Sequence, residues 1–203
     1  MKKFPISLLV LAAALAITPT AFADSIIAGN DTVPRSYVDT YYNFVVIDSV
    51  NPAQTSALIT GWNIYAANTL PVELLIYKPD GGDNYTLMGE SALMTPAVGV
   101  NSFILTSPIP MEPGDVVGLY FASTGSVPFD YTTGATVFHY TNPNSYDLTV
   151  GSESYFNPLG ERTYSVDVTG LVIPEPSTLF LLGTGLFGMA GLFARRVKAA
   201  RGR

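Results

Sequence analysis

The sequence predicts an all-β protein, a single antiparallel β-sandwich followed by one C-terminal transmembrane helix. Three observations support this prediction. Short runs of β-branched and aromatic residues, separated by glycine, proline and asparagine, fill the central region. No segment of helical period appears before residue 177. An uncharged apolar run then extends from residue 177 to residue 194. We therefore divide the chain into segments 1–23, 24–173 and 174–203.

The first segment, residues 1–23, has the three parts of a secretory signal peptide. Two lysines follow the initial methionine, an apolar run covers residues 6–17, and Ala21 and Ala23 stand where a signal peptidase reads small side chains. The apolar run is shorter than the roughly 20 residues that span a bilayer, which favours cleavage over an uncleaved anchor. We expect signal peptidase to act here and the mature chain to begin at Asp24.

Residues 24–173 contain the predicted β-sandwich, and its strands are expected from alternation. Val72, Leu74 and Ile76 share one face of a strand, whereas Ser165 and Asp167 are expected to point outward from another. The remaining β-rich runs are 37–47, 57–65, 85–89, 102–105, 116–122, 136–140 and 146–150. A jelly-roll-like topology is preferred and an immunoglobulin-like one is the alternative, because strand order does not follow from the pattern.

Turn residues separate these runs. The Pro-Asp-Gly-Gly-Asp sequence within residues 78–84 predicts a hairpin loop. Pro108 and Pro110, followed by Pro113 and Gly114, are expected to interrupt the chain before the next strand. The stretch from residue 62 to residue 130 is similar to extracellular bacterial β-sandwich modules, a resemblance that implies the fold and no activity.

Composition excludes several kinds of site. The chain has no cysteine and one histidine, which excludes thiolate zinc sites, cysteine nucleophiles and multi-histidine metal sites. Residues 24–173 hold 15 acidic and three basic residues, a net charge of −12. Such a charge disfavours binding to nucleic acid, since phosphate contacts need cations. We expect no cofactor and no nucleic-acid partner.

The candidate chemical residues each have a simpler explanation. The sequence contains no Gly-x-Ser-x-Gly motif whose serine His139 could activate as a nucleophile. We therefore expect His139 to be a structural or surface histidine, and we expect no catalytic residue. Asp80, Asp83 and Asn84 offer oxygen ligands for calcium, but turn chemistry accounts for them and we expect no metal site.

Aromatic residues are the remaining candidates for ligand binding. All 12 tyrosines and the one tryptophan, Trp62, lie in residues 24–173. Aromatic rings stack on sugar faces, but they also fill β-sandwich cores, which is the leading interpretation. On a strand, Tyr41 and Tyr42 would point to opposite faces, so one of them is expected to be exposed.

The last segment begins with a stiff peptide and continues as an apolar run. Pro174, Glu175 and Pro176 form no regular helix or central strand. Residues 177–194 are 18 residues without charge, which reaches the length of a transmembrane helix. The cations that follow predict a cytoplasmic tail over residues 195–203; the first of them, which stop translocation, are Arg195, Arg196 and Lys198.

This combination of motif, apolar span and basic tail resembles the PEP-CTERM sorting signal of exopolysaccharide-producing Gram-negative bacteria. The resemblance covers about 30 residues, 174–203. It implies recognition by an exosortase, a membrane protease-transpeptidase, with cleavage near Pro174, Glu175 and Pro176. A permanent single-span anchor is the alternative.

The leading hypothesis is an exported, non-enzymatic protein of the cell surface or extracellular matrix. It would be anchored in the inner membrane through lipid contacts of residues 177–194, with its body outside the cytoplasm. After processing it would be structural or adhesive in an exopolysaccharide or biofilm layer, with extracellular polysaccharide as a candidate partner. The alternative is a carbohydrate- or calcium-binding module held as a single-span membrane protein.

Overall fold

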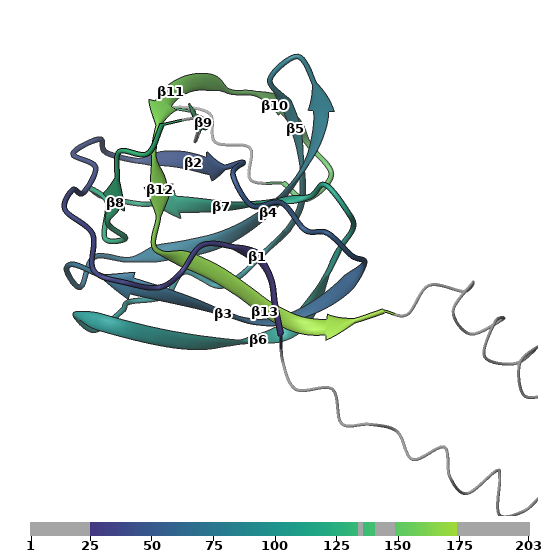
Figure 1. Ribbon diagram of the computed structural model, residues 1–203, viewed down its shortest axis with the longest axis horizontal. Coiled ribbons are helices and arrows are strands. Elements are labelled where there is room, and N and C mark those ends of the chain that lie inside the picture. The colour runs from purple at the N-terminus through teal and green to yellow at the C-terminus, as the bar shows by residue number, and fades with distance from the viewer. Residues whose placement is uncertain (1–24, 134–135, 141–148, 174–203) are drawn as a thin grey trace, which may run out of the picture.

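A computed structural model describes residues 25–133, 136–140 and 149–173, which form 13 strands paired antiparallel (Figure 1). The prediction of an all-β, antiparallel fold is confirmed. Within these ranges no helix has the length and apolar character needed to cross a membrane. The predicted helix at residues 177–194 lies outside the described residues. The choice between jelly-roll-like and immunoglobulin-like topology stays a prediction.

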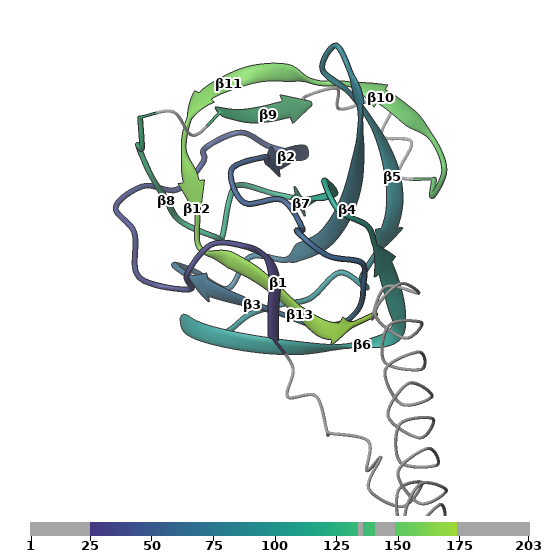
Figure 2. The ribbon, with the colours of Figure 1, turned by 45° about the vertical axis from the view of Figure 1, so that its right-hand side comes forward.

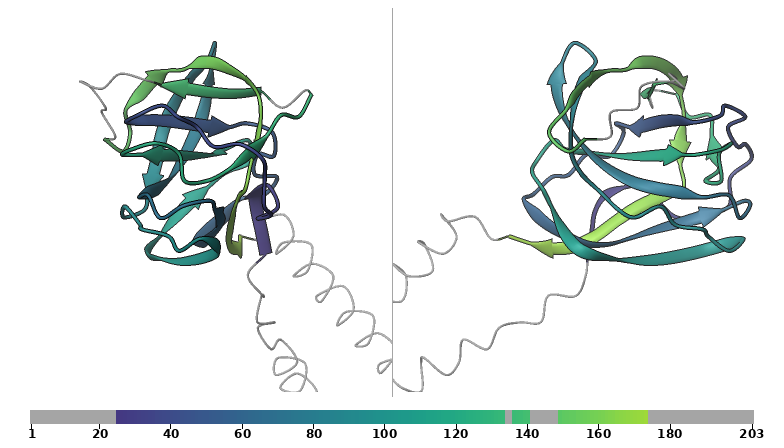
Figure 3. Two further views of the ribbon diagram at one scale, coloured as in Figure 1. Left: turned by 90° about the vertical axis from the view of Figure 1, so that its left-hand side faces the viewer. Right: turned by 180° about the vertical axis from the view of Figure 1, so that it is seen from behind.

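One layer of the fold is a four-stranded sheet of order β1-β13-β3-β6. Its strands are β1 (Ser25–Gly29), β13 (Val166–Val172), β3 (Ala57–Ala66) and β6 (Gly99–Met111). The N-terminal strand lies against the C-terminal one, with Ser25 opposite Gly170. The beginning of β1 and the end of β13 therefore lie at the same end of the sheet (Figure 3).

The second layer is a seven-stranded sheet of order β10-β5-β4-β7-β2-β9-β11. Its strands are β10 (Glu153–Tyr155), β5 (Asn84–Glu90), β4 (Val72–Gly81), β7 (Val116–Phe121), β2 (Phe44–Asp48), β9 (Thr136–Tyr140) and β11 (Asn157–Glu161). The two edge strands, β10 and β11, are consecutive in the chain, with only Phe156 between them. The sheet is therefore curled, and residues 153–161 arch from one edge to the other (Figure 2). A short pair, β8 (Phe129–Asp130) with β12 (Thr163–Tyr164), lies beside the two sheets.

The main hydrophobic core lies between the two sheets. Trp62, Ile64 and Val168 contribute from the four-stranded sheet, and Leu74 and Phe121 contribute from the curled sheet, all fully buried. The predicted alternation of β4 is confirmed on this face, where Val72, Leu74 and Ile76 are buried.

A second core fills the inside of the curled sheet. Leu75 and Tyr77 belong to β4 but lie on the face opposite Leu74, and they pack with Tyr85 and Phe156. The Tyr77 ring lies 5.3 Å from the Phe156 ring at 73°, an edge-to-face geometry that is favourable for aromatic pairs. Both faces of β4 are buried over residues 74–77, where the sequence is uninterrupted Leu-Leu-Ile-Tyr, and the strand becomes polar and exposed over residues 78–81.

The hairpin between β4 and β5 confirms the predicted turn and makes it tighter than the sequence suggested. Strand β4 continues to Gly81, and β5 begins at Asn84. The two residues between them, Gly82 and Asp83, have φ of 60° and 64°. Positive φ at both positions is the signature of a two-residue type I′ turn.

Three expectations about the strands are wrong, and a fourth is tested only in part. Strand β6 runs through Pro108 and Pro110 to Met111, because an edge strand tolerates residues that lack an N–H group. Ser165 and Asp167 are buried, since the loop after β1 covers Ser165 and Asn63 bonds Asp167. The expected strand at residues 37–47 begins only at Phe44; the part of 146–150 that is described, residues 149–150, is not a strand.

Candidate sorting and binding sites

The chain leaves the described fold at a fixed point. Strand β13 ends at Val172, and the backbone N–H of the next residue, Ile173, donates a hydrogen bond of 2.8 Å to the carbonyl oxygen of Ser56. Ile173 is therefore still tied to the segment that leads into β3. In the sequence Pro174 follows Ile173 directly, so only one residue separates β13 from the proline motif.

The sequence-predicted processing residues lie outside the described residues. They are Ala21 and Ala23 of the signal peptide, Pro174, Glu175 and Pro176 of the sorting motif, and Arg195, Arg196 and Lys198 of the basic cluster. Their roles stay predictions. Within the described residues, the beginning of β1 and the end of β13 lie at one end of the four-stranded sheet, with Ser25 opposite Gly170.

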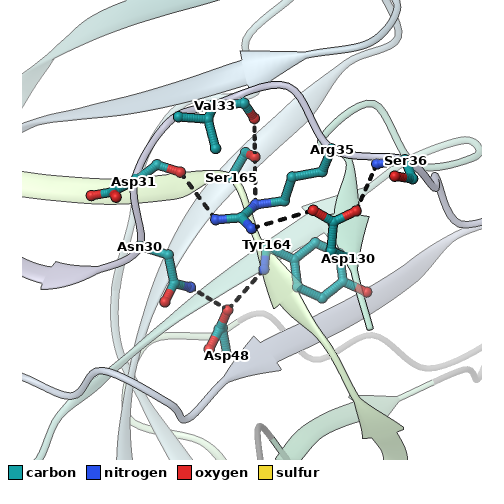
Figure 4. A network of polar contacts seen from close by, with 9 residues as sticks. All are labelled: Asn30, Asp31, Val33, Arg35, Ser36, Asp48, Asp130, Tyr164 and Ser165. Atoms are coloured by element: carbon teal, nitrogen blue, oxygen red, sulfur yellow. Dashed lines mark hydrogen bonds and ion pairs between the residues drawn. The ribbon is translucent and has the colours of Figure 1, made fainter. Parts of the chain in front are cut away.

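A buried carboxylate fixes the segment that follows β1. Asp48, at the end of β2, accepts hydrogen bonds of 2.6 Å from the Asn30 side-chain amide and 3.1 Å from the backbone N–H of Tyr164 (Figure 4). Burial raises the pKa of Asp48, and these donors counteract that effect. The network joins three distant parts of the chain: the loop after β1, β2 and β12.

Arg35 extends this network to the protein surface. Its Nε donates a hydrogen bond of 2.8 Å to Ser165 Oγ, and its Nη1 lies 3.7 Å from Asp130 Oδ2 (Figure 4). Asp130 Oδ1 accepts a hydrogen bond of 2.9 Å from the backbone N–H of Ser36. The Ser36 N–H and Arg35 lower the pKa of Asp130, so this carboxylate stays ionised.

The network positions two exposed aromatic rings. Tyr37 pairs with Phe129 through two backbone hydrogen bonds of 3.1 and 2.8 Å. Its ring centre lies 5.0 Å from that of Tyr131, and the two side chains are 51% and 64% exposed. We call this pair the Tyr37/Tyr131 platform. Asp130, whose side chain is 39% exposed, directly precedes Tyr131 in the chain, and the Arg35 side chain that pairs with it is 12% exposed. Exposed aromatic rings with a hydrogen-bond acceptor nearby in the chain suit a ligand with both apolar faces and hydroxyl groups.

A buried ion pair supports the platform from below. Arg162 bonds to Asp39 and donates a 3.2 Å hydrogen bond to the Tyr164 hydroxyl. The guanidinium carbon of Arg162 also lies 4.2 Å from the centre of the Phe129 ring and 6.0 Å from that of Tyr131. A desolvated guanidinium in this position attracts aromatic rings, so the ion pair helps to hold the Phe129 and Tyr131 rings in place.

The inner face of the curled sheet carries an unusual carboxyl group. Glu73 lies opposite Tyr120 of β7, on the same face of β4 as Leu75. Burial, with a smaller contribution from the nearby Glu90 carboxylate, raises the pKa of Glu73 to about 7. Sequence pattern did not indicate this raised pKa, because alternation with Val72 and Leu74 predicts that the Glu73 side chain lies on a solvated face.

The remaining sequence candidates do not converge. His139 lies in β9 with Asn157 and Val46 as its neighbours across the sheet; its side chain is outside the described part. Asp80 is engaged by Lys78 at 3.3 Å and by the Thr86 hydroxyl. Among the described residues, no three His, Asp or Glu side chains are grouped as metal ligands.

The structure also separates buried from exposed aromatic candidates. Trp62 is 1% exposed and packs against Phe103, with 4.6 Å between the ring centres, so it is a core residue. Tyr41 and Tyr42 precede β2 in a loop, so the alternation expected for a strand does not apply to them, and both are exposed. Local sequence pattern did not indicate Tyr37 and Tyr131, because tertiary bonds from Arg35 and Arg162 create their arrangement.

Comparison with known proteins identifies the carboxyl-terminal segment. Residues 172–197 match the family model of the PEP-CTERM protein-sorting motif. No curated protein and no solved structure matches the chain. The motif match begins at Val172, the last residue of β13, so it overlaps the end of the fold by two residues that the structure describes. The resemblance found in the sequence is thus confirmed: this chain carries a PEP-CTERM protein-sorting motif at its carboxyl end.

Proposed function

We propose that this protein is an exported, non-enzymatic component of the cell surface or extracellular matrix, with a structural or adhesive role in an exopolysaccharide layer. The observation that carries the proposal is the PEP-CTERM motif at residues 172–197, which indicates sorting by an exosortase.

The proposed route uses both ends of the chain. Signal peptidase cleaves after Ala23, and residues 177–194 hold the chain in the inner membrane with Arg195, Arg196 and Lys198 on the cytoplasmic side. An exosortase then cuts near Pro174, Glu175 and Pro176 and delivers the β-domain to the cell surface or the medium. The tie between Ile173 and Ser56 supports this route, because it keeps the folded domain intact up to the cleavage region.

The acidic body suits this destination. With 15 acidic and three basic residues between positions 24 and 173, the domain is repelled by anionic lipid and nucleic acid. Divalent cations outside the cell can bridge such a surface to an acidic polysaccharide. The role proposed here is therefore attachment within a polymer layer.

The test is complementation of a deletion strain. The wild-type chain is compared with a variant in which Pro174, Glu175 and Pro176 are replaced by alanine, and both are followed by cell fractionation and by the cohesion of the polysaccharide layer. We expect the wild-type protein in the matrix fraction and the variant in the inner membrane, with cohesion restored only by the wild type. The proposal would be contradicted if the variant retained in the membrane restored the cohesion of the polysaccharide layer as well as the wild type does.

Saccharide binding is a second candidate function, favoured by the Tyr37/Tyr131 platform. Polysaccharide pull-down should weaken several-fold for Tyr37→Ala and Tyr131→Ala. Tyr155→Ala is a matched control, since that residue is 51% exposed but belongs to β10 at an edge of the seven-stranded sheet, whereas the platform lies beside β8. Equal retention of all three variants would remove this candidate.

A further inference from the structure

Strand β6 forms an open edge of the four-stranded sheet. Its residues 99–104 pair with residues 61–66 of β3, from Gly99 opposite Ala66 to Ile104 opposite Gly61. On the other side of β6, the sheet order ends within the part of the chain that the structure describes (Figure 1). In an antiparallel strand, alternate residues direct their N–H and C=O groups away from the paired neighbour. Residues 99–104 therefore present a row of backbone donors and acceptors to an incoming strand.

The usual protections of an edge strand begin only after this segment. The next pair along the ladder is Ile109 with Ile59, so residues 105–108 form a bulge, and Pro108 and Pro110 lie in and after it. Bulges, prolines and charged side chains prevent edge-to-edge pairing. Residues 99–104 have none of these features. The opposite edge of the same sheet, β1, has only five residues and is itself interrupted between Ile26 and Ala28.

The charge distribution favours a second copy of this chain at that edge. Residues 49–72, which include β3, and residues 91–111, which include β6, contain no charged side chain. The body as a whole carries a net charge of −12. Two copies repel one another across most of their surfaces, and the uncharged β3 and β6 side is where they approach with least repulsion.

The side chains of β6 are complementary to themselves. If two antiparallel copies of the strand meet with Ser102 opposite Ser102, then Val100 of each copy lies opposite Ile104 of the other. Val100 is 65% exposed and Ile104 is 90% exposed, so this register covers the two most exposed apolar side chains of the strand. Cross-strand pairs of β-branched residues stabilise antiparallel sheets.

We propose that two copies of this protein associate through residues 100–104 of β6, as antiparallel strands related by a two-fold axis near Ser102. The four-stranded sheets of the two copies then form one continuous sheet of eight strands. Association of this kind links neighbouring domains without any other partner, and it does not depend on the sorting route or on saccharide binding.

Disulfide trapping tests the proposal directly, because the chain has no cysteine of its own. Directly opposed residues of an antiparallel pair have Cα atoms about 4.5–5.5 Å apart, within the range that a disulfide spans. In the full-length chain exported to the oxidising cell envelope, Ser102→Cys should give a disulfide-linked dimer on a non-reducing gel. Thr132→Cys is the control. Thr132 is exposed and lies away from β6, and the control variant keeps the same amino-terminal and carboxyl-terminal segments as Ser102→Cys.

A second pair of variants separates strand pairing from random collision. Ile104→Lys places a charge on the edge and should reduce the Ser102→Cys dimer several-fold. Ile26→Lys introduces the same charge at a 61% exposed position in β1 and should leave the dimer unchanged. The proposal is overturned if Ser102→Cys gives no more dimer than Thr132→Cys, or if the dimer persists in the presence of Ile104→Lys.

Discussion

Replacing Glu73 by glutamine should stabilise the protein at alkaline pH and leave its stability unchanged at acidic pH. The folded protein holds this carboxyl group on the inner face of the curled sheet, near Tyr120 and Glu90, where burial raises its pKa from 4.5 to about 7. The unfolded chain ionises near 4.5, but the folded protein retains the proton until about pH 7. Stability is therefore lost as the pH rises through this interval.

The magnitude follows from the pKa change. One pKa unit corresponds to about 1.4 kcal/mol, so the full change from 4.5 to about 7 gives roughly 3 kcal/mol. Glu73 keeps part of its surface in solvent, and screening reduces the expected cost to about 1–2 kcal/mol. For a domain of about 150 residues, this corresponds to a Tm difference of about 5 °C.

The assay is thermal unfolding of the purified full-length protein and of Glu73→Gln between pH 4 and pH 8. The difference in Tm should be near zero at pH 4 and should grow to about 5 °C at pH 8. Glu153→Gln, at an exposed position in β10, should show no such trend. A Tm difference for Glu73→Gln that is constant with pH, or that shrinks as the pH rises, would refute the reasoning.

Two further substitutions test how the fold is held together. Asp39→Ala leaves the Arg162 guanidinium buried without its carboxylate, so it should reduce the free energy of unfolding, measured in urea, by about 3–5 kcal/mol. The double variant Asp39→Ala with Arg162→Met should recover part of that loss, because no unpaired charge stays buried. A double variant as unstable as Asp39→Ala alone would contradict the ion-pair explanation. Gly170→Ala should lower the free energy of unfolding by about 1–3 kcal/mol and speed amide exchange in β13, because the alanine Cβ would lie 2.2 Å from the Leu58 carbonyl oxygen. Unchanged amide exchange in this variant would contradict such close packing of β13 against β3.

The fold class was predictable because alternation and turn residues act locally. Gly82 and Asp83 occupy the turn their residue types favour, and β3 nearly matches its predicted range. The second core was not predictable. Leu75 and Tyr77 face the inside of a curled sheet whose two edge strands are joined through residues 153–161, and alternation carries no information about curling.

The candidate sites divide in the same way. The sorting motif is a continuous peptide, so Pro174, Glu175 and Pro176 were recognisable from their order alone. The Tyr37/Tyr131 platform depends on the Arg35–Asp130 salt bridge and on the buried Arg162, which join distant parts of the chain, and no local sequence pattern predicts such contacts. For the same reason, Ser165 and Asp167 were assigned to the wrong environment.

The central claim is that a folded β-domain is exported and then separated from its carboxyl-terminal segment. The most direct measurement is the intact mass of the protein recovered from the medium and the cell envelope of a strain that contains an exosortase. We expect a chain that begins at Asp24 and lacks residues 177–203. A recovered protein that retains residues 177–203 would contradict processing at the motif and favour a permanent anchor.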